Sequence, residues 1–178
     1  QPERMQLVVR GYNDGFAFCY KIPDGKGPCV NVQSELTAYN FAGDYTAWFY
    51  NGENHNIGPE KLTETDGTRL PVMTVKAGDK HYMAIHEACL ETGAPLVLQS
   101  KGGESLFSVA SKPTSLSPGY TSAWRVVLYG TTPGVLTDSH LLELLNPDPD
   151  SRYDFSWVKP GLAVWDWRIN GAVWDGFT

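Results

Sequence analysis

Apolar and polar positions alternate with a period of two through the first hundred residues, and turn residues interrupt them roughly every eight to twelve positions. Because successive side chains of a strand point to opposite faces, this pattern predicts antiparallel sheet packed as a β-sandwich. The predicted strands cover residues 16–22, 30–32, 35–41, 72–75 and 82–90. Turn residues at 77–80 separate the last two strands and predict a hairpin.

A long polar segment interrupts this pattern. Residues 51–69 are rich in Asn, Gly, Thr and Glu. We expect a long surface loop here, and ordered loops of this length are uncommon unless they are functional. Such a loop either closes over a ligand or is simply solvated.

One further strand and one helix follow. Residues 124–130 predict a strand, and 132–134 carry the residues of a turn. The helix is predicted to begin at Asp138 as the N-cap residue, to continue through the leucines of 141–145, and to end at Asn146-Pro147.

The composition changes after Pro147. Residues 148–151 resemble a linker, and four of the six tryptophans lie in the last 22 residues. The segment 164–167 predicts a strand, and so many aromatic residues need a large partner to pack against. We therefore expect a sandwich domain at 1–150 and the linker and start of a second domain at 151–178, in a chain cut from a longer protein.

Composition and charge exclude several classes of protein. The chain has 178 residues, 42% of them apolar, and 20 carboxylates against 14 Lys and Arg, with a net charge of -6. A binder of nucleic acid needs clustered positive charge, and this chain has no basic run. The longest apolar stretches are far shorter than the roughly 20 residues that cross a bilayer, so no membrane span is expected.

No catalytic motif assembles from this chain alone. His86-Glu87 resembles the start of a zinc-protease motif, but Leu90 stands where the second histidine belongs. The cysteines are too far apart for a zinc site, and they form either one disulfide with a spare thiol or three buried thiols. These residues are Cys19, Cys29 and Cys89.

Glu87 is the one charged residue that its position makes unusual. In the predicted strand 82–90 it shares a face with Met83 and Ile85, where an unpaired carboxylate would be costly. It either faces solvent or an arginine at the strand end, or it points at a cation or a neighbouring domain. Calcium would suit such a carboxylate. We expect Glu35 and Arg125 to be structural partners at the sandwich surface rather than catalytic residues.

The aromatic run Trp165-Asp166-Trp167 also has two interpretations. Aromatic rings beside a carboxylate form a stacking platform and a hydroxyl acceptor in many sugar sites. Tryptophans in the core of a domain are commoner, so core packing is the other interpretation. If the run forms a sugar site, Asp166 and Trp167 are the candidate substrate-binding residues.

Several segments together resemble one family, in its order and across nearly the whole chain. They are residues 9–18, Glu35-Leu36-Thr37, Ala84-Ile85-His86-Glu87-Ala88, Ala123-Trp124-Arg125-Val126, and 156–161 with 165–167. The family is glycoside hydrolase family 97, the bacterial α-glucosidase and α-galactosidase group.

The resemblance implies a mainly β fold, an antiparallel β-supersandwich that lacks its N-terminal strands here, followed by the first strand of a catalytic (β/α)8 barrel. It implies an exo-acting α-glycosidase that hydrolyses terminal α-linked glucose or galactose from oligosaccharides with the help of calcium. Glu87 is the best match for the calcium ligand that the sandwich supplies. The catalytic carboxylates would lie beyond Thr178, so this part alone is expected to be inactive.

The resemblance also implies partners and a location. The partners are an oligosaccharide substrate and the barrel domain of the same protein, and the location is the bacterial periplasm or outside the cell. The alternative function is a non-catalytic carbohydrate-binding β-sandwich module.

Overall fold

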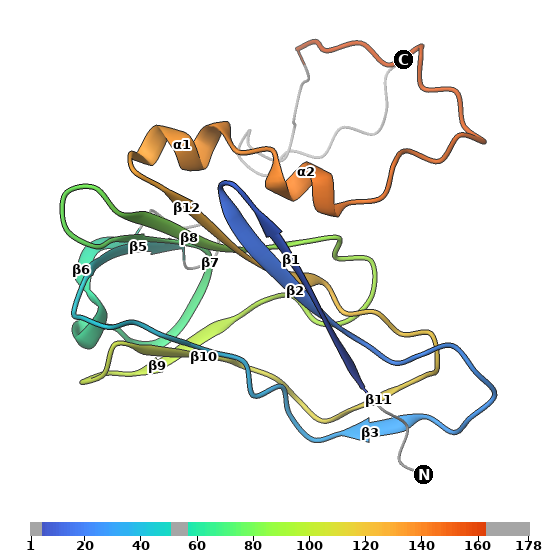
Figure 1. Ribbon diagram of the computed structural model, residues 1–178, viewed down its shortest axis with the longest axis horizontal. Coiled ribbons are helices and arrows are strands. Elements are labelled where there is room, and N and C mark those ends of the chain that lie inside the picture. The colour runs from blue at the N-terminus through green and yellow to red at the C-terminus, as the bar shows by residue number, and fades with distance from the viewer. Residues whose placement is uncertain (1–4, 51–56, 163–178) are drawn as a thin grey trace, which may run out of the picture. The chain divides into compact units, whose positions relative to one another are not determined.

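The computed structural model describes residues 5–50 and 57–162 (Figure 1). The chain divides into two compact units, Gln1–Pro147 and Asp148–Thr178. The first unit is mainly β, as predicted. The described part of the second, residues 148–162, contains turns and neither a strand nor a helix. The strand predicted at 164–167 lies outside the described residues, so the domain assignment there stays a prediction.

All strand pairs of the first unit are antiparallel, and ten strands form one sheet. Its main path runs through β1 (Gln6–Tyr12), β2 (Gly15–Lys21), β12 (Trp124–Gly130), β8 (Tyr82–Ala88), β7 (Asp66–Lys76), β9 (Leu98–Lys101), β10 (Leu106–Val109) and β4 (Ala38–Asn40). Off this path, β5 (Thr46–Tyr50) pairs with β7 and with β6 (Ile57–Lys61). A separate two-stranded sheet contains β3 (Val30–Val32) and β11 (Thr114–Leu116).

The long strand β7 makes the sheet fold over on itself. Its residues 66–69 pair with β9, whereas 73–76 pair with β8. The two arms therefore face each other, and β9 and β10 lie below β8 and β12 in Figure 1. Side chains from both arms fill the space between them with the first hydrophobic core. This core consists of Ala47, Phe49, Leu62, Met73, Val75, Ile85, Leu96, Leu98, Phe107 and Val109.

A second core lies on the opposite face of β2, β12 and β8. Two short helices, α1 (Pro133–Asp138) and α2 (Leu141–Leu145), lie on this face (Figure 1), and α2 buries Leu141 and Leu145. The sheet contributes Ala17, Cys19, Ala84, Ala88, Trp124, Val126 and Leu128. Strand β8 is therefore buried on both faces, because Ile85 enters the first core and Ala84 the second. No helix of the described residues is long and apolar enough to cross a membrane.

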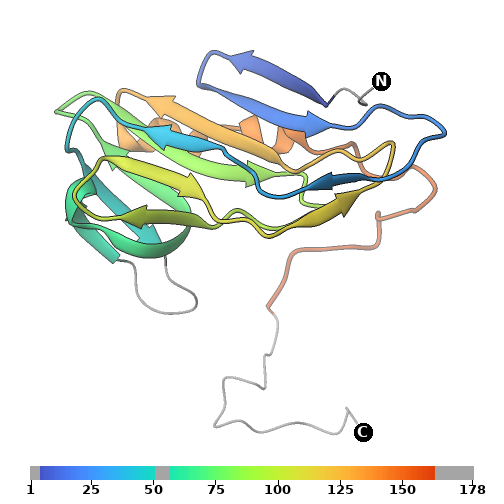
Figure 2. The same cartoon turned by 90° about the horizontal axis from the view of Figure 1, so that it is seen from below.

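The sheet face that carries the first core is exposed to solvent at the outer strand β1. Leu7 and Val9 lie opposite Tyr20 and Phe18 in the β1–β2 register, so they share the face of the first core. Their exposed fractions are nevertheless 59% and 60%. Figure 2 shows β1 at the outer margin, with only β2 beside it. We call Leu7 and Val9 the β1 row.

The predicted strands 16–22, 30–32, 82–90 and 124–130 are confirmed, as is the hairpin between β7 and β8. The predicted strand 35–41 is shorter and covers only Ala38–Asn40.

The loop predicted at 51–69 is wrong for the residues that the structure describes. Residues 57–61 form β6, 62–64 form a 3-10 helix, and 66–69 begin β7. Leu62 and Thr65 are fully buried. Among the described residues β6 pairs with β5 alone and exposes Gly58, Pro59 and Lys61, and composition does not distinguish such an exposed strand from a loop.

The helix predicted over the leucines of 141–145 and ending at Asn146 is confirmed as α2, but its predicted start at Asp138 is wrong. Helix α1 ends at Asp138, and α2 begins at Leu141. The Leu141 N–H donates to Ser139 Oγ at 3.2 Å, so the serine, not the aspartate, accepts at the start of α2. The turn predicted at 132–134 is instead the start of α1, since proline fits the first helical turn.

All three cysteines are free thiols. Cys19 is buried and Cys89 is half-buried, but Cys29 is exposed, so the interpretation as three buried thiols is wrong for Cys29.

We expect Phe107→Ala to destabilise the fold strongly. Phe107 is fully buried and its ring lies 5.6 Å from that of Phe49. Truncation should lower the free energy of unfolding by about 3–5 kcal/mol, measured by urea denaturation. Leu36→Ala is the control, because Leu36 is 87% exposed and should change stability by about 0.5 kcal/mol or less. Equal losses in both variants would contradict the assigned core.

Candidate functional site

Glu87 lies where the first core ends along β8. Ile85, two positions earlier on the same face, is fully within that core. The Glu87 side chain is only 12% exposed. A carboxylate in this position needs partners, because losing water without replacement is costly.

Arg125 supplies the main partner. It is directly opposite Glu87 in the β12–β8 register, and its side chain is 4% exposed. Its Nη1 donates to Glu87 Oε2 at 3.3 Å. Its Nε and Nη2 donate to the two oxygens of Glu35 at 3.0 and 2.7 Å, a bidentate pair of the strong type. We call these three residues the Glu35–Arg125–Glu87 network.

The carboxylates keep Arg125 firmly charged. Burial alone would lower the pKa of the guanidinium, but the hydrogen bond and charge of Glu35, together with the charge of Glu87, raise it above its ordinary value. The network therefore holds two negative charges and one positive charge. Glu35 and Arg125, which we expected to be structural partners, contact each other. For Glu87, the partner is an arginine, one of the alternatives that the sequence left open.

The two oxygens of Glu87 are not equivalent. Oε2 accepts from Arg125 and also from the Leu96 backbone N–H at 2.7 Å. Oε1 has no hydrogen-bond donor among the described residues. The Leu96 contact could not be found from the sequence, because nothing marks an apolar residue as the donor to a carboxylate.

His86 is held neutral beside this carboxylate. The Glu87 N–H donates to His86 Nδ1 at 2.8 Å, so that nitrogen acts as an acceptor and carries no proton. Burial lowers the pKa of the imidazole, and the charge of Glu87 opposes that shift only in part.

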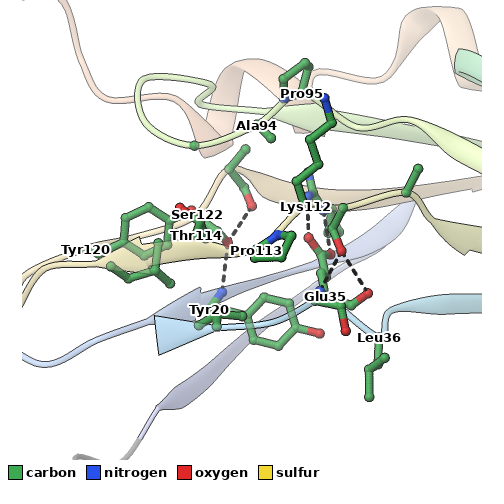
Figure 3. A pocket seen from close by; sticks show the side chains of 18 of the residues that line it. Tyr20, Glu35, Leu36, Ala94, Pro95, Lys112, Pro113, Thr114, Tyr120 and Ser122 are labelled. Carbon is green, nitrogen blue, oxygen red and sulfur yellow. Dashed lines mark hydrogen bonds and ion pairs between the residues drawn. The ribbon is translucent and has the colours of Figure 1, made fainter. Parts of the chain in front are cut away.

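A hollow of about 850 Å³ adjoins the network. Figure 3 shows Tyr20, Glu35 and Leu36 on one side and Ala94 and Pro95 on the other. Tyr20 and Tyr120 give it aromatic walls, and the Tyr20 hydroxyl is hydrogen-bonded to Thr37 Oγ1 at 2.8 Å.

A buried hydroxyl group lies close to the same charges. The oxygen of Tyr39 is inaccessible to water and has no hydrogen-bond partner among the described residues. Burial raises the pKa of this phenol, and the nearby Arg125 guanidinium opposes the shift. The side chain therefore stays protonated.

The number of oxygen ligands that this part of the chain can supply decides how calcium could fit. Calcium takes about six to eight oxygen ligands. No group of three or more acidic, histidine or cysteine side chains capable of holding a metal occurs in residues 5–50 and 57–162. Glu87 Oε1 is a suitable hard oxygen, so this part of the chain fits calcium as a donor of one ligand to a site completed elsewhere. Asp166 and Trp167 lie outside the described residues.

The fold and the network define a β-sandwich domain in which Arg125 joins Glu35 to Glu87, and Glu87 keeps one oxygen without a donor among the described residues. The sequence model described as "Glycosyl-hydrolase 97 N-terminal" matches residues 1–147. The chain therefore belongs to glycoside hydrolase family 97, in its N-terminal region, as the sequence resemblance predicted.

Two curated relatives are similar over most of this chain. A retaining α-galactosidase of Bacteroides thetaiotaomicron is 27% identical over 90% of the chain and 30% of its own length. A probable retaining α-galactosidase of Streptomyces bingchenggensis is 29% identical over 94% of the chain and 27% of its own length. The chain thus spans less than a third of the length of these relatives.

Solved structures show the same fold. A family 97 enzyme from Pseudoalteromonas sp. strain K8, in complex with acarbose, has a TM-score of 0.75 and 25% identity over 88% of this chain and 25% of its own. A β-arabinopyranosidase with a TM-score of 0.58 and 16% identity, over 71% of this chain and 25% of its own, shares the fold alone.

We expect His86 to make stability depend on pH. Its pKa is lowered in the folded chain, so below its ordinary pKa of about 6.5 the unfolded chain binds the proton more readily. Stability should therefore fall as the pH drops from 7.5 to 5. His86→Asn offers an amide oxygen that can accept the same N–H but does not titrate.

The urea midpoints of both proteins at pH 7.5 and pH 5 test this expectation. The fall should be smaller in His86→Asn, while the carboxylates contribute equally to both. An identical fall in the two proteins would show that His86 titrates in the same way folded and unfolded.

Proposed function

We propose that this chain is the sandwich part of an exo-acting α-glycosidase that hydrolyses terminal α-linked galactose or glucose from oligosaccharides. The observation that carries the proposal is the family match over residues 1–147. The names of both curated relatives favour galactose. A structural relative solved in complex with acarbose supports an oligosaccharide as the substrate. The catalytic carboxylates would belong to a barrel beyond Thr178, so this part alone would not hydrolyse glycosides.

We propose that Glu87 gives one ligand to calcium in the complete protein. Its Oε2 accepts from two protein donors, whereas Oε1 accepts from none among the described residues and would be available to a cation. When bound, calcium would orient or polarise groups at the sugar site. Glu87 itself would bring a negative charge from the sandwich to that site.

The substrate-binding assignment of Asp166 and Trp167 rests on sequence alone. The carboxylate would accept hydrogen bonds from sugar hydroxyls, and the indole ring would stack on the sugar face. They would belong to the first barrel strand, within the segment 151–178.

Further strands of the longer protein would complete the sandwich of residues 1–150. The exposed β1 row supports this proposal, because an apolar edge strand with open backbone groups is ready to pair and pack. The barrel of the same protein would be the second partner. The bacterial periplasm or the cell exterior is the proposed location, and it rests on the resemblance alone.

The hollow beside the network favours a second candidate function, a non-catalytic carbohydrate-binding module. Its aromatic walls, Tyr20 and Tyr120, are side chains on which sugars stack. This candidate requires the sandwich to bind oligosaccharide by itself.

We expect Glu87→Gln in the full-length enzyme to weaken calcium binding with little loss of stability. The amide oxygen can still accept from Leu96 and Arg125, while the NH2 group replaces the open oxygen and cannot bind a cation. Calcium affinity should fall by more than the roughly 10- to 100-fold typical of residues that only orient a ligand, since a charged ligand is itself lost. Titration calorimetry of the metal-stripped enzyme measures it.

Glu87→Ala is the matched comparison. It also leaves the Leu96 N–H and the Arg125 guanidinium short of a partner, so it should lower the thermal midpoint clearly more than Glu87→Gln. Unchanged calcium affinity in both folded variants would refute the ligand assignment.

The 178-residue chain alone should neither hydrolyse an aryl α-galactoside nor bind maltooligosaccharides or galactooligosaccharides. Calorimetric titration and release of the aryl group measure the two properties. Saturable binding that Tyr120→Ala abolishes, with an unchanged thermal midpoint, would favour the carbohydrate-binding module instead.

A further inference from the structure

We propose that Arg125, held in place by Glu35, is a positioning residue that orients the Glu87 carboxylate so that Oε1 is presented to a divalent cation. This inference rests on the proposed role of Glu87 as a ligand. It assigns a function to two residues that touch neither the cation nor the substrate.

The geometry fixes one oxygen of Glu87 from two directions. Arg125 Nη1 reaches Oε2 from the neighbouring strand β12, and the Leu96 N–H reaches it from the segment that follows β8. A carboxylate is planar, so two donors on one oxygen also restrict the direction of the other. Rotation of the Glu87 side chain would break both contacts and leave Arg125 Nη1 and the buried Leu96 N–H without this acceptor, while Arg125 stays paired with Glu35.

Arg125 is in turn held by Glu35. The bidentate contact restricts rotation of the guanidinium about its own axis, which a single contact would allow. Glu35 is anchored through its backbone N–H, which donates to Ser111 Oγ at 2.8 Å. A continuous series of contacts therefore runs from Ser111 through Glu35 and Arg125 to Glu87.

The positive charge of Arg125 lets an experiment separate positioning from charge repulsion. A guanidinium 3.3 Å from the ligand oxygen repels a second cation, so taken by itself Arg125 should weaken calcium binding. Glu35 compensates that charge and leaves the network with a net charge of -1. Positioning and simple charge repulsion therefore predict opposite effects when the guanidinium is removed.

The test is the calcium affinity of the metal-stripped full-length protein, titrated with calcium alone. Arg125→Lys keeps the charge but loses the forked contact, and Arg125→Met loses both. Positioning predicts that each weakens calcium binding about 10- to 100-fold, the usual range for residues that orient a metal ligand. Tighter binding by Arg125→Met would show that Arg125 only competes with calcium and would overturn the proposal.

Glu35→Gln provides a second variant that keeps a hydrogen bond to Arg125 and does not leave the guanidinium without an acceptor. It should also weaken calcium binding, about tenfold, because Arg125 keeps one acceptor in place of two and loses its compensating charge. If the Arg125 variants do not fold, Glu35→Gln alone tests the positioning role. A calcium affinity equal to that of the wild type would then refute that role.

Arg69→Lys is the matched control. Arg69 also pairs with a glutamate in the same domain, with its Nη2 3.5 Å from Glu60 Oε2, but it lies outside the network. Calcium affinity should be unchanged in this variant. The thermal midpoint of each calcium-free protein shows whether it is folded, and a merely structural role would lower that midpoint without changing the affinity of the folded protein.

The two proposals fail in different ways. If the wild type binds no calcium, or if Glu87→Gln binds it as tightly as the wild type, the ligand assignment fails and the positioning role fails with it. If Glu87→Gln loses calcium while the folded Arg125 and Glu35 variants bind it normally, the ligand assignment stands and only the positioning role is refuted.

Discussion

The guanidinium of Arg125 lies between two strands at the end of a hydrophobic core and is almost completely removed from water. A charge in such a place needs acceptors of matching geometry, since an unpaired buried charge costs several kcal/mol. Both oxygens of Glu35 and one oxygen of Glu87 meet this need. The same contacts join three parts of the chain: the segment before β4, the central strand β8 and its neighbour β12. Local order around the candidate site depends on this single cation.

The position of the network follows from the way the sheet folds. Strand β7 pairs with both arms, so side chains of the two arms meet over β5, β7 and β8 and exclude water there. Along β8 this core includes Ile85, and the next residue on the same face is Glu87, whose side chain is 12% exposed. Glu35 and Arg125 line the hollow, so the network lies between this core and the hollow. One oxygen of Glu87 is committed to two donors, and the other accepts from none among the described residues.

Local pattern was sufficient for part of this structure. Alternation identified β2, β8 and β12, and it identified Glu87 because a carboxylate interrupts an apolar row. It failed at β6 and at the start of β7, because these segments are polar and bury few apolar side chains. It also failed at the short helices, where Ser139 rather than Asp138 accepts the first N–H of α2. Two neighbouring residues with similar capping ability cannot be told apart without the tertiary structure.

The sequence by itself determined the antiparallel β class, the family, the structural role expected of Glu35 and Arg125, and the need of Glu87 for a partner. It did not determine that one arginine meets both requirements, nor which oxygen of Glu87 stays open. Arg125 is 90 residues from Glu35 and 38 from Glu87, and the third contact comes from the backbone of an apolar residue. Contacts over such separations depend on sheet register and chain reversal. Neither has a local signature in the sequence, so only the folded chain decides them.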